Sequence, residues 1–297
     1  MQTVPTSARA WLAFASCGAI WGSTFLAISL GNDELAPIWA ATLRLGLAAV
    51  LLGLWEKVRG QALPRGPALR AAVFYGICQF GIQLPLLYWG EQRVPSGLAA
   101  VFFATIPLSS ALLTRALGME RLTSAKLFGA LVAVAGVSLL FASAFSGHIS
   151  PAGMAAIFVS ATVAGVGSIL LKRGPRQSPV GVNAVGCAIG AGMAFLESLA
   201  LREPHRWPTT WASLAPILYL TLAGSLGAFV LMSWLINHWP VTRTSYVSVI
   251  IPVIALLLGV VIRGERLTWS SLGGTILVLM GLLMGMRTPR TAADGNR

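Results

Sequence analysis

Charge is scarce along this chain. Only 10% of the 297 residues are Asp, Glu, Lys or Arg, whereas 56% are apolar and the mean hydropathy is +0.77. A water-soluble fold of this size could not bury so much apolar surface. The composition therefore excludes a soluble globular protein and predicts a chain that lies in a lipid bilayer.

Acids, cysteines and histidines are also few. The nine acids fall between apolar runs or at their ends, so we expect no carboxylate at mid-membrane to carry a proton or bind sodium. Glu91, at the edge of a run, remains a candidate for such coupling. The three cysteines lie in separate apolar runs and the three histidines lack ligand spacing, so the sequence predicts no metal site, cofactor or catalytic residue.

Long uncharged runs fill most of the sequence. A run of about 20 residues spans the hydrocarbon core as a helix, at 1.5 Å per residue. We predict an all-α membrane protein with ten transmembrane helices, at approximately 11–30, 36–55, 69–90, 95–115, 123–141, 151–171, 179–199, 211–236, 241–262 and 268–286.

The basic residues indicate the orientation. With the N-terminus in the cytoplasm, most of the 21 Lys and Arg residues fall in cytoplasmic loops, which predicts that both termini are cytoplasmic. Basic loops that face anionic lipid also account for the net charge of +12, so no nucleic-acid partner is expected. The preference for Arg over Lys is associated with GC-rich bacteria, and we expect a bacterial plasma (inner) membrane.

One segment occurs twice. Glu120–Gly136 (ERLTSAKLFGALVAVAG) and Glu265–Gly281 (ERLTWSSLGGTILVLMG) lie 145 positions apart. The same offset aligns Trp89 with Trp234, Pro95 with Pro240 and Pro107 with Pro252. Each unit, 11–141 and 151–286, holds five predicted spans. Because five is odd, the second unit must be inverted in the membrane, which is the architecture of many secondary transporters.

Several motifs are similar to those of a known family. WGSTFLAI (Trp21–Ile28), Arg44, Pro107 with GMERLT, and Pro252 with RGERLT resemble the paired EamA domains of the drug/metabolite transporter superfamily. The resemblance covers both units and implies ten helices and the export or exchange of small metabolites. The chain is also similar to the YddG-type amino-acid exporters, although the quoted motifs identify no substrate.

Arg44 is the single charge deep inside a predicted span. It could contact a substrate carboxylate or act as a gate. It could also serve as a structural clamp on backbone carbonyls or reach toward the interface. The superfamily pattern has Arg at this place across unlike substrates, so we favour the clamp.

A polar stripe marks the third span. Tyr75, Gln79 and Gln83 are four residues apart and would share one face of an α-helix. Amides are costly in hydrocarbon, so this face should point inward, either to line a substrate cavity or to bond neighbouring helices. The repeat places Gly224 and Ala228 opposite the glutamines, where small residues would leave space.

Two prolines interrupt the fourth and ninth spans. Pro107 and Pro252 would free the backbone carbonyls of Phe103 and Ser248, and broken helices in matching places of two halves point to a transport site. A tolerated kink is the alternative. We interpret the prolines as hinges and add Phe103, Tyr246 and Ser248 to the substrate-binding candidates.

Glycine spacing in the fifth and tenth spans predicts close helix packing, within the chain or at a homodimer face, so a monomer and a homodimer both remain open. The ERLT boxes are interpreted as helix starts, with Thr123 and Thr268 as caps.

The sequence favours a secondary transporter that exports or exchanges small organic solutes by alternating access. Amino acids, including aromatic ones, are the expected substrates, and nucleosides or amphipathic drugs fit the same description. A membrane-embedded enzyme or an assembly subunit is the other class considered. An enzyme would need a nucleophile–base pair or metal cluster, and the sequence offers neither.

Overall fold

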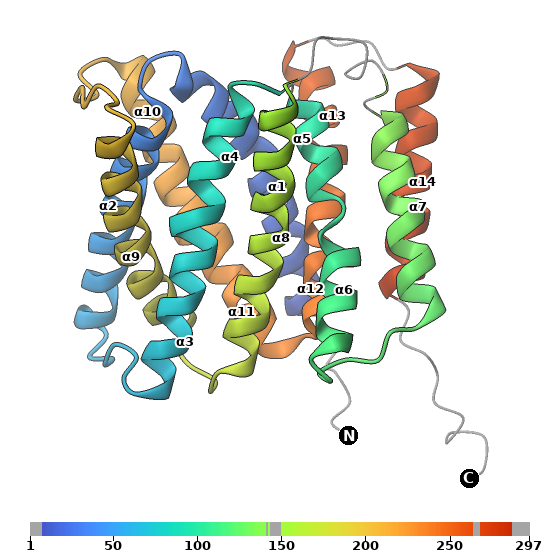
Figure 1. Ribbon diagram of the computed structural model, residues 1–297, viewed down its shortest axis with the longest axis horizontal. Helices are drawn as coiled ribbons and strands as arrows, with labels where there is room; N and C mark the ends of the chain where they lie inside the picture. Colours follow the sequence, from blue (N-terminus) through green and yellow to red (C-terminus); the bar gives the residue numbers. More distant parts are fainter. Residues whose placement is uncertain (1–7, 95, 141, 143–149, 264–267, 287–297) are drawn as a thin grey trace.

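Helices make up the regular structure of this protein (Figure 1). The computed structural model describes residues 8–94, 96–140, 142, 150–263 and 268–286, and within these ranges there is no β-strand. The helices in chain order are α1 (Ala8–Asn32), α2 (Pro37–Val58), α3 (Pro67–Gly76), η1 (Ile77–Ile82), α4 (Gln83–Glu91), α5 (Ser96–Phe103), α6 (Ile106–Ala116), α7 (Ser124–Leu140), α8 (Pro151–Arg173), α9 (Pro179–Ala200), α10 (Trp211–Tyr219), η3 (Leu220–Phe229), α11 (Val230–His238), α12 (Val241–Ser245), α13 (Val247–Arg263) and α14 (Trp269–Met286).

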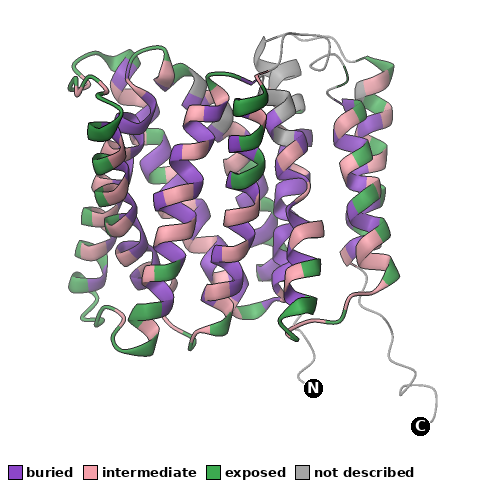
Figure 2. Ribbon diagram, in the orientation of Figure 1, coloured by how far each residue is buried: buried purple, intermediate pink, exposed green. Residues whose placement is uncertain are grey.

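Six of these helical segments are long and apolar enough to cross a membrane: Ala8–Asn32, Pro37–Val58, Pro67–Glu91, Pro151–Arg173, Pro179–Ala200 and Trp211–His238. Shorter apolar helices occupy Val101–Ala116, Ser124–Leu140, Val241–Ile254 and Leu272–Met286. Large apolar side chains such as Leu12, Phe128 and Leu283 remain more than half exposed, on helices whose other faces are buried (Figure 2). An apolar outer surface of this kind suits lipid contact, and the chain is a multi-pass membrane protein.

The third and eighth predicted spans are not continuous α-helices. η1 and η3 are π-helical segments that join α3 to α4 and α10 to α11. Shifted by 145 positions, η1 corresponds to residues 222–227, which fall inside η3. The helix therefore has wider, π-type turns at the same place in both predicted units. Turns of this type occur frequently at functional sites.

The fourth and ninth predicted spans are also interrupted. α5 and α6 are separated at Ala104–Thr105, and Pro107 is the second residue of α6, where its missing N–H costs no helix bond. In the second half the break lies at Tyr246, between α12 and α13, whereas Pro252 lies inside α13. The two breaks thus differ in their distance from the equivalent prolines.

Matching helices of the two units pack against each other in opposite directions. At one end of the α2–α9 pair, Glu203, just past α9, accepts backbone N–H bonds from Ile38 (3.2 Å) and Trp39 (2.8 Å) at the start of α2. At the other end, the Ser178 hydroxyl at the start of α9 donates to Glu56 near the end of α2 (2.5 Å). Each acid therefore binds the first turn of the partner helix, where the helix dipole favours a negative charge.

α7 and α14 form the second antiparallel pair. A Cβ atom added at Gly129 would lie 2.4 Å from the Gly285 backbone nitrogen, and one added at Gly274 would lie 2.6 Å from the Leu140 backbone nitrogen. The glycines allow the two backbones to touch within one chain, as the packing interpretation predicted. Thr123 also bonds the Lys126 amide (3.3 Å), as predicted for the first ERLT box. Pro95 and most of the second box, including Glu265, lie outside the described residues.

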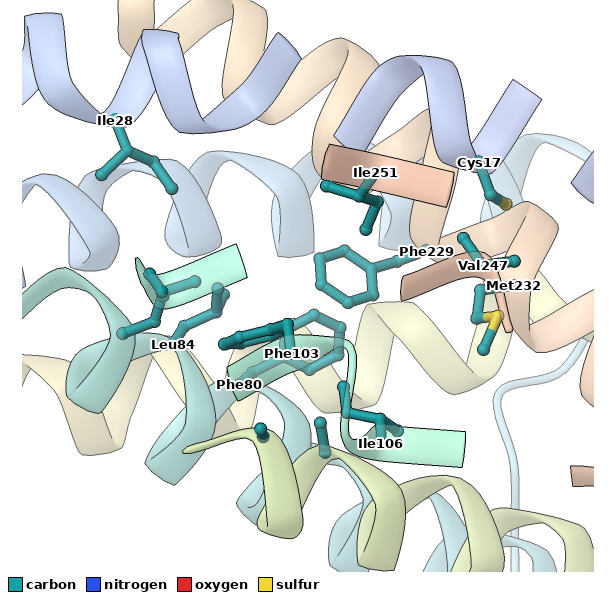
Figure 3. Close-up of a cluster of buried hydrophobic side chains, with 14 of the residues drawn as sticks. Cys17, Ile28, Phe80, Leu84, Phe103, Ile106, Phe229, Met232, Val247 and Ile251 are labelled. Carbon is teal, nitrogen blue, oxygen red and sulfur yellow. The ribbon is translucent and has the colours of Figure 1, made fainter. Parts of the chain in front are cut away.

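The apolar core lies where the two units meet (Figure 3). Phe80 of η1 and Phe229 of η3 pack edge to face with ring centroids 4.7 Å apart, and Leu84, Phe103 and Ile251 gather around them. α1 packs on η3 and α13 of the second unit, while α8 packs on η1, α4 and α6 of the first. The first helix of each unit therefore packs against the other unit, and the two units share one core.

Candidate solute cavity

A cavity opens within this shared core. Its volume is about 90 Å³, counted as the space open to the centres of water-sized molecules, which is room for several waters. It is lined by Trp21, Thr24, Ile28, Arg44, Gln79, Gln83, Leu84, Leu87, Phe103, Ile106, Ser110, Ala164, Ser168, Phe229, Met232, Thr244, Ser245, Val247, Ser248 and Ile251. Both predicted units contribute, so the cavity lies at their interface.

The lining preserves the internal repeat. Four pairs of lining residues stand 145 positions apart: Leu84 and Phe229, Leu87 and Met232, Phe103 and Ser248, and Ile106 and Ile251. Equivalent positions of the two units thus face one space, as expected for a site placed about a pseudo-two-fold axis.

The two glutamines predicted to face inward do line the cavity. Gln79 Nε2 donates a hydrogen bond to Gln83 Oε1 (3.2 Å), and both side chains are less than one-tenth exposed. In the described part of the chain, Gln79 Oε1 and Gln83 Nε2 make no further hydrogen bond. The pair therefore presents one acceptor and one donor, and the amides stay available to a polar solute.

Arg44 also lines the cavity, and it is 2% exposed. Its Nε donates to the Ser225 hydroxyl (3.0 Å) and its Nη1 to the Tyr88 hydroxyl (3.2 Å). Both acceptors are neutral side chains, and Ser225 belongs to η3 of the other unit. The guanidinium is thus fixed across the unit interface. A Cβ at Gly224 would lie 2.7 Å from Arg44 Nη2, so the space predicted opposite the amides is occupied by this guanidinium.

Several lining hydroxyls bond backbone carbonyls close to them in the sequence. Thr24, Ser168 and Ser248 donate to backbone carbonyls three or four residues earlier, at 2.8 Å, 3.1 Å and 2.8 Å. Two other polar atoms of the lining, Ser110 Oγ and Trp21 Nε1, are buried without a hydrogen-bond partner. An unpaired buried donor is costly, and these two groups have unused hydrogen-bonding capacity on the cavity wall.

The other predicted site residues lie outside the lining. Tyr75 is buried and packs edge to face on Phe80, with ring centroids 5.7 Å apart. Tyr246 donates to the Lys126 backbone carbonyl (3.1 Å). Pro107 and Pro252 are near the lining residues Ile106 and Ile251 in sequence but are not lining residues themselves.

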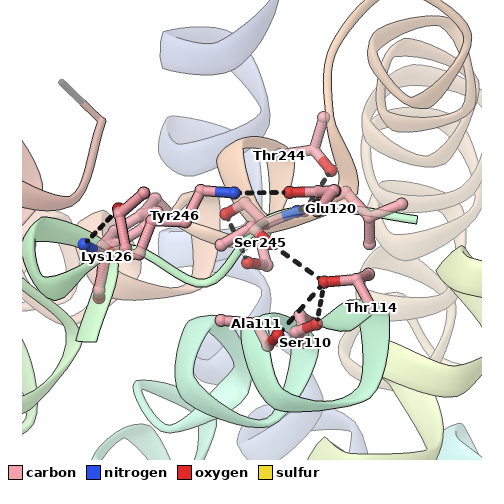
Figure 4. A network of polar contacts seen from close by, with 11 residues as sticks. Ser110, Ala111, Thr114, Glu120, Lys126, Thr244, Ser245 and Tyr246 are labelled. Carbon is pink, nitrogen blue, oxygen red and sulfur yellow. Dashed lines mark hydrogen bonds and ion pairs between the residues drawn. The ribbon is translucent and has the colours of Figure 1, made fainter. Parts of the chain in front are cut away.

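A polar network ties α6, α7 and α12 together (Figure 4). Glu120 accepts from the Thr242 backbone N–H (3.2 Å) and forms an ion pair with Lys126 (2.8 Å). Thr114 bonds the Ser110 carbonyl (2.7 Å) and lies 3.5 Å from the Thr242 hydroxyl. Ser110 and the α12 residues Thr244 and Ser245 line the cavity. The network therefore fixes the positions of α6 and α12 on one side of the cavity.

Glu91 ends α4 in a buried setting. Both of its carboxylate oxygens are inaccessible to water and have no hydrogen-bond partner. The expectation that acids stay at the ends of spans holds for this residue, and its burial keeps it a candidate for ion coupling. Among the described residues, no three His, Cys, Asp or Glu side chains are grouped to hold a metal ion.

The family follows from comparison with known proteins. The model of the EamA-like transporter family matches residues 9–142 and again residues 151–286. The chain belongs to the EamA-like transporter family. It is therefore a membrane transporter and not an enzyme.

Curated relatives of this EamA-like transporter cover nearly its whole length. The chain is 30% identical over 275 residues to the "uncharacterized inner membrane transporter YedA" of Escherichia coli K12, covering 90% of the chain and 88% of the relative. It is 29% identical to a "probable terminal-alkyne amino-acid exporter" of Streptantibioticus cattleyicolor, covering 89% of each. It is 28% identical to a "probable amino-acid metabolite efflux pump" of Salmonella typhimurium, covering 92% of the chain and 94% of the relative.

A solved crystal structure shares the fold of the transporter. The two chains superimpose with a TM-score of 0.78 at 23% identity, over 93% of this chain and 95% of the other. The likeness extends over both EamA units, so their arrangement is that of a known fold.

Sequence reasoning missed part of the transporter's cavity. Trp21, Thr24, Ser110, Thr244 and Ser245 line it but were not among the predicted site residues. Hydroxyls that bond their own helix are common in membrane spans, so Ser and Thr carry little signal. Only the pairing of Gly22-Ser23 with Gly167-Ser168 at the repeat offset could have drawn attention to Ser168.

Proposed function

We propose that this EamA-like protein is a secondary transporter that exports or exchanges small organic solutes by alternating access. The chain would cross the membrane ten times as two inverted five-helix repeats, 11–141 and 151–286, with both termini in the cytoplasm. A bacterial inner membrane is the proposed location, consistent with the name of the Escherichia coli relative.

The pseudo-symmetric cavity is the observation that carries this proposal. Four pairs of equivalent residues line one space between antiparallel units. Two similar units can exchange conformations across such an axis, so that the cavity opens to one side and then to the other. The π-helical segments η1 and η3 and the breaks at Ala104–Thr105 and Tyr246 supply backbone that can bend.

Amino acids, including aromatic ones, are the substrates we propose. The amides of Gln79 and Gln83 provide polar contacts, and Phe103 and Phe229 provide an aromatic wall. Two of the relatives carry names that refer to amino-acid or amino-acid metabolite export. Nucleosides and amphipathic drugs are the alternative substrates, because they also combine polar groups with apolar rings. We propose no cofactor and no nucleic-acid partner, and either a monomer or a homodimer.

Uptake into liposomes tests the proposal. The purified protein is reconstituted, the vesicles are loaded with unlabelled solute, and exchange of labelled amino acids, nucleosides and a cationic dye is followed in parallel. We expect exchange of at least one amino acid above the rate of protein-free vesicles. Exchange of nucleosides alone would favour the alternative. The absence of any movement across the panel would contradict a solute transporter of this kind.

A further inference from the structure

Arg44 is the only charged residue among those that line the described cavity. Among the described residues, the ion pair is formed by Glu120 and Lys126. No carboxylate of the described chain therefore lies within ion-pair distance of Arg44. A buried cation without an acidic partner is costly in a low-dielectric site. The cavity therefore carries an unbalanced positive charge whenever it is empty.

We infer that Arg44 binds the carboxylate of the transported solute and thereby selects carboxylate-bearing solutes over the corresponding amines. This inference rests on the proposed transport function and assigns its specificity to one residue. An anion would balance the guanidinium, and bidentate binding to a carboxylate is the geometry that Arg favours. A cationic amine would bring a second positive charge into the same space.

The hydrogen bonds of Arg44 support this role over that of a structural clamp. A clamp would bond backbone carbonyls, but the guanidinium donates only to the side chains of Ser225 and Tyr88. Nη2 makes no hydrogen bond in the described part of the chain. It lies against position 224, where an added Cβ would be 2.7 Å from it. Two donors are thus used to fix the group, and further donors remain for a ligand.

The rest of the lining fits the remainder of an amino acid. Gln79 Oε1 is an unused acceptor on the same cavity, suitable for an ammonium group. Phe103, Phe229 and Leu84 provide apolar wall for a side chain. The equivalent of Arg44 in the second unit is Ile189, so the charge is not repeated and the solute is expected to bind in one orientation.

Matched acid–amine pairs in reconstituted liposomes test the inference. L-Phenylalanine is compared with phenethylamine, L-leucine with 3-methylbutylamine, and L-threonine with 1-amino-2-propanol, so each pair differs by the carboxylate alone. Arg44→Gln and Arg44→Lys are measured beside wild type and Arg93→Gln, a matched control that removes an exposed arginine two residues past the end of α4. Ser225→Ala and Tyr88→Phe remove the two groups that hold the guanidinium. Thermal unfolding in detergent identifies any variant that fails to fold.

We expect wild type and Arg93→Gln to move acids and not amines. Arg44→Gln should raise the KM for acids by about 10- to 100-fold, the usual effect of losing a hydrogen bond to a charged group, and Arg44→Lys should retain part of the preference. Ser225→Ala and Tyr88→Phe should raise the KM less, without loss of folded protein.

Three results would overturn the assignment. In the first, wild type moves the amines as well as it moves the acids. In the second, folded Arg44→Gln keeps the wild-type KM for acids. In both cases transport itself persists, so the proposed function survives and only the role of Arg44 is lost. If every Arg44 variant unfolds while Ser225→Ala and Tyr88→Phe leave the KM unchanged, Arg44 is structural. If wild type moves no member of any pair, the proposed amino-acid substrate fails as well.

Discussion

The third helical segment of the first EamA unit presents Gln79 and Gln83 to the cavity, whereas the equivalent positions of the second unit are Gly224 and Ala228. Arg44 has Ile189 as its counterpart. By contrast, the helix pairs α2–α9 and α7–α14 are built alike from both units, with an acid beside the first turn of each helix in the first pair and glycines from both helices along the second.

The contrast separates two roles. Contacts that hold the units together are repeated, because two conformations related by the pseudo-axis need similar packing energies. The polar side chains Arg44, Gln79 and Gln83 of the cavity are not repeated, because a small solute is itself asymmetric. Repeated packing contacts should therefore govern folding, repeated prolines should govern the rate of bending, and unrepeated polar side chains should govern solute binding. The following predictions test that division.

The first prediction concerns the inversion and has an all-or-none outcome. A reporter active only in the cytoplasm should work when fused after Gln177, between α8 and α9, and fail when fused after Ser146, which lies outside the described residues. One helix separates the two positions, so they should lie on opposite sides of the membrane. Equal signals at the two positions, or the reverse pattern, would rule out the inverted repeat with cytoplasmic termini.

The second prediction compares two equivalent glycines. A Cβ would lie 2.6 Å from a backbone nitrogen at Gly136 and 2.5 Å from one at Gly281, so Gly136→Val and Gly281→Val should each lose at least about 3 kcal/mol of stability. Thermal unfolding in detergent measures this loss. Gly192→Ala is the control, because a Cβ there meets nothing within 4 Å. A large loss of stability at one glycine and none at the other would show that the packing of α7 on α14 is not symmetric.

The third prediction addresses the unrepeated amides. Gln79→Leu and Gln83→Leu should slow transport about ten-fold, the effect of losing one hydrogen bond to a solute, with little change in unfolding temperature. The Gln83 backbone carbonyl keeps its bond from Ser160 (2.9 Å) in either variant. The exposed Gln92→Leu serves as control. Normal transport by both cavity variants would mean that the amides only join helices.

The fourth prediction concerns the equivalent prolines and has the smallest effect. Pro252→Ala should stabilise the protein by about 1 kcal/mol or less, because a helix N–H is regained inside α13. Pro107→Ala should leave the stability nearly unchanged, because Pro107 lies in the first turn of α6, where an N–H has no helix partner. Each replacement should slow exchange a few-fold, because the backbone becomes harder to bend. Pro107 adjoins the break at Ala104–Thr105, so its replacement should slow exchange more than that of Pro252 inside α13. Rates unchanged in both variants would remove the hinge hypothesis.

Much of the helix arrangement could be predicted from the sequence, because the hydropathy and the repeat offset are properties of whole helices. The predicted runs lie close to the observed helices, and the inward placement of Gln79 and Gln83 agrees with the cavity. The third member of the polar stripe, Tyr75, does not line the cavity. η1 lies between Tyr75 and Gln83, and a π-helical turn holds more residues than an α-helical turn, so a spacing of four no longer keeps one face.

Local backbone breaks and long-range contacts could not be predicted from the sequence. The break at Tyr246 precedes Pro252 by six residues and has no proline of its own, so residue type alone did not mark it. The contacts of Arg44 were equally hidden, because Ser225 is 181 positions away and reaches Arg44 only through packing between the units. Pairings of this kind depend on tertiary structure, which neither periodicity nor composition reports.

Two-sided labelling of Gln83→Cys tests alternating access most directly. The variant is made in a background in which Cys17, Cys78 and Cys187 are replaced by Ala, and a membrane-impermeant thiol reagent is applied to right-side-out and inside-out vesicles. Leu131→Cys, at a lipid-facing position of α7 that is 46% exposed, serves as control and should not react. We predict that Gln83→Cys reacts from both sides and that a transported solute slows both reactions. Reaction from one side only, or from neither, would contradict the account.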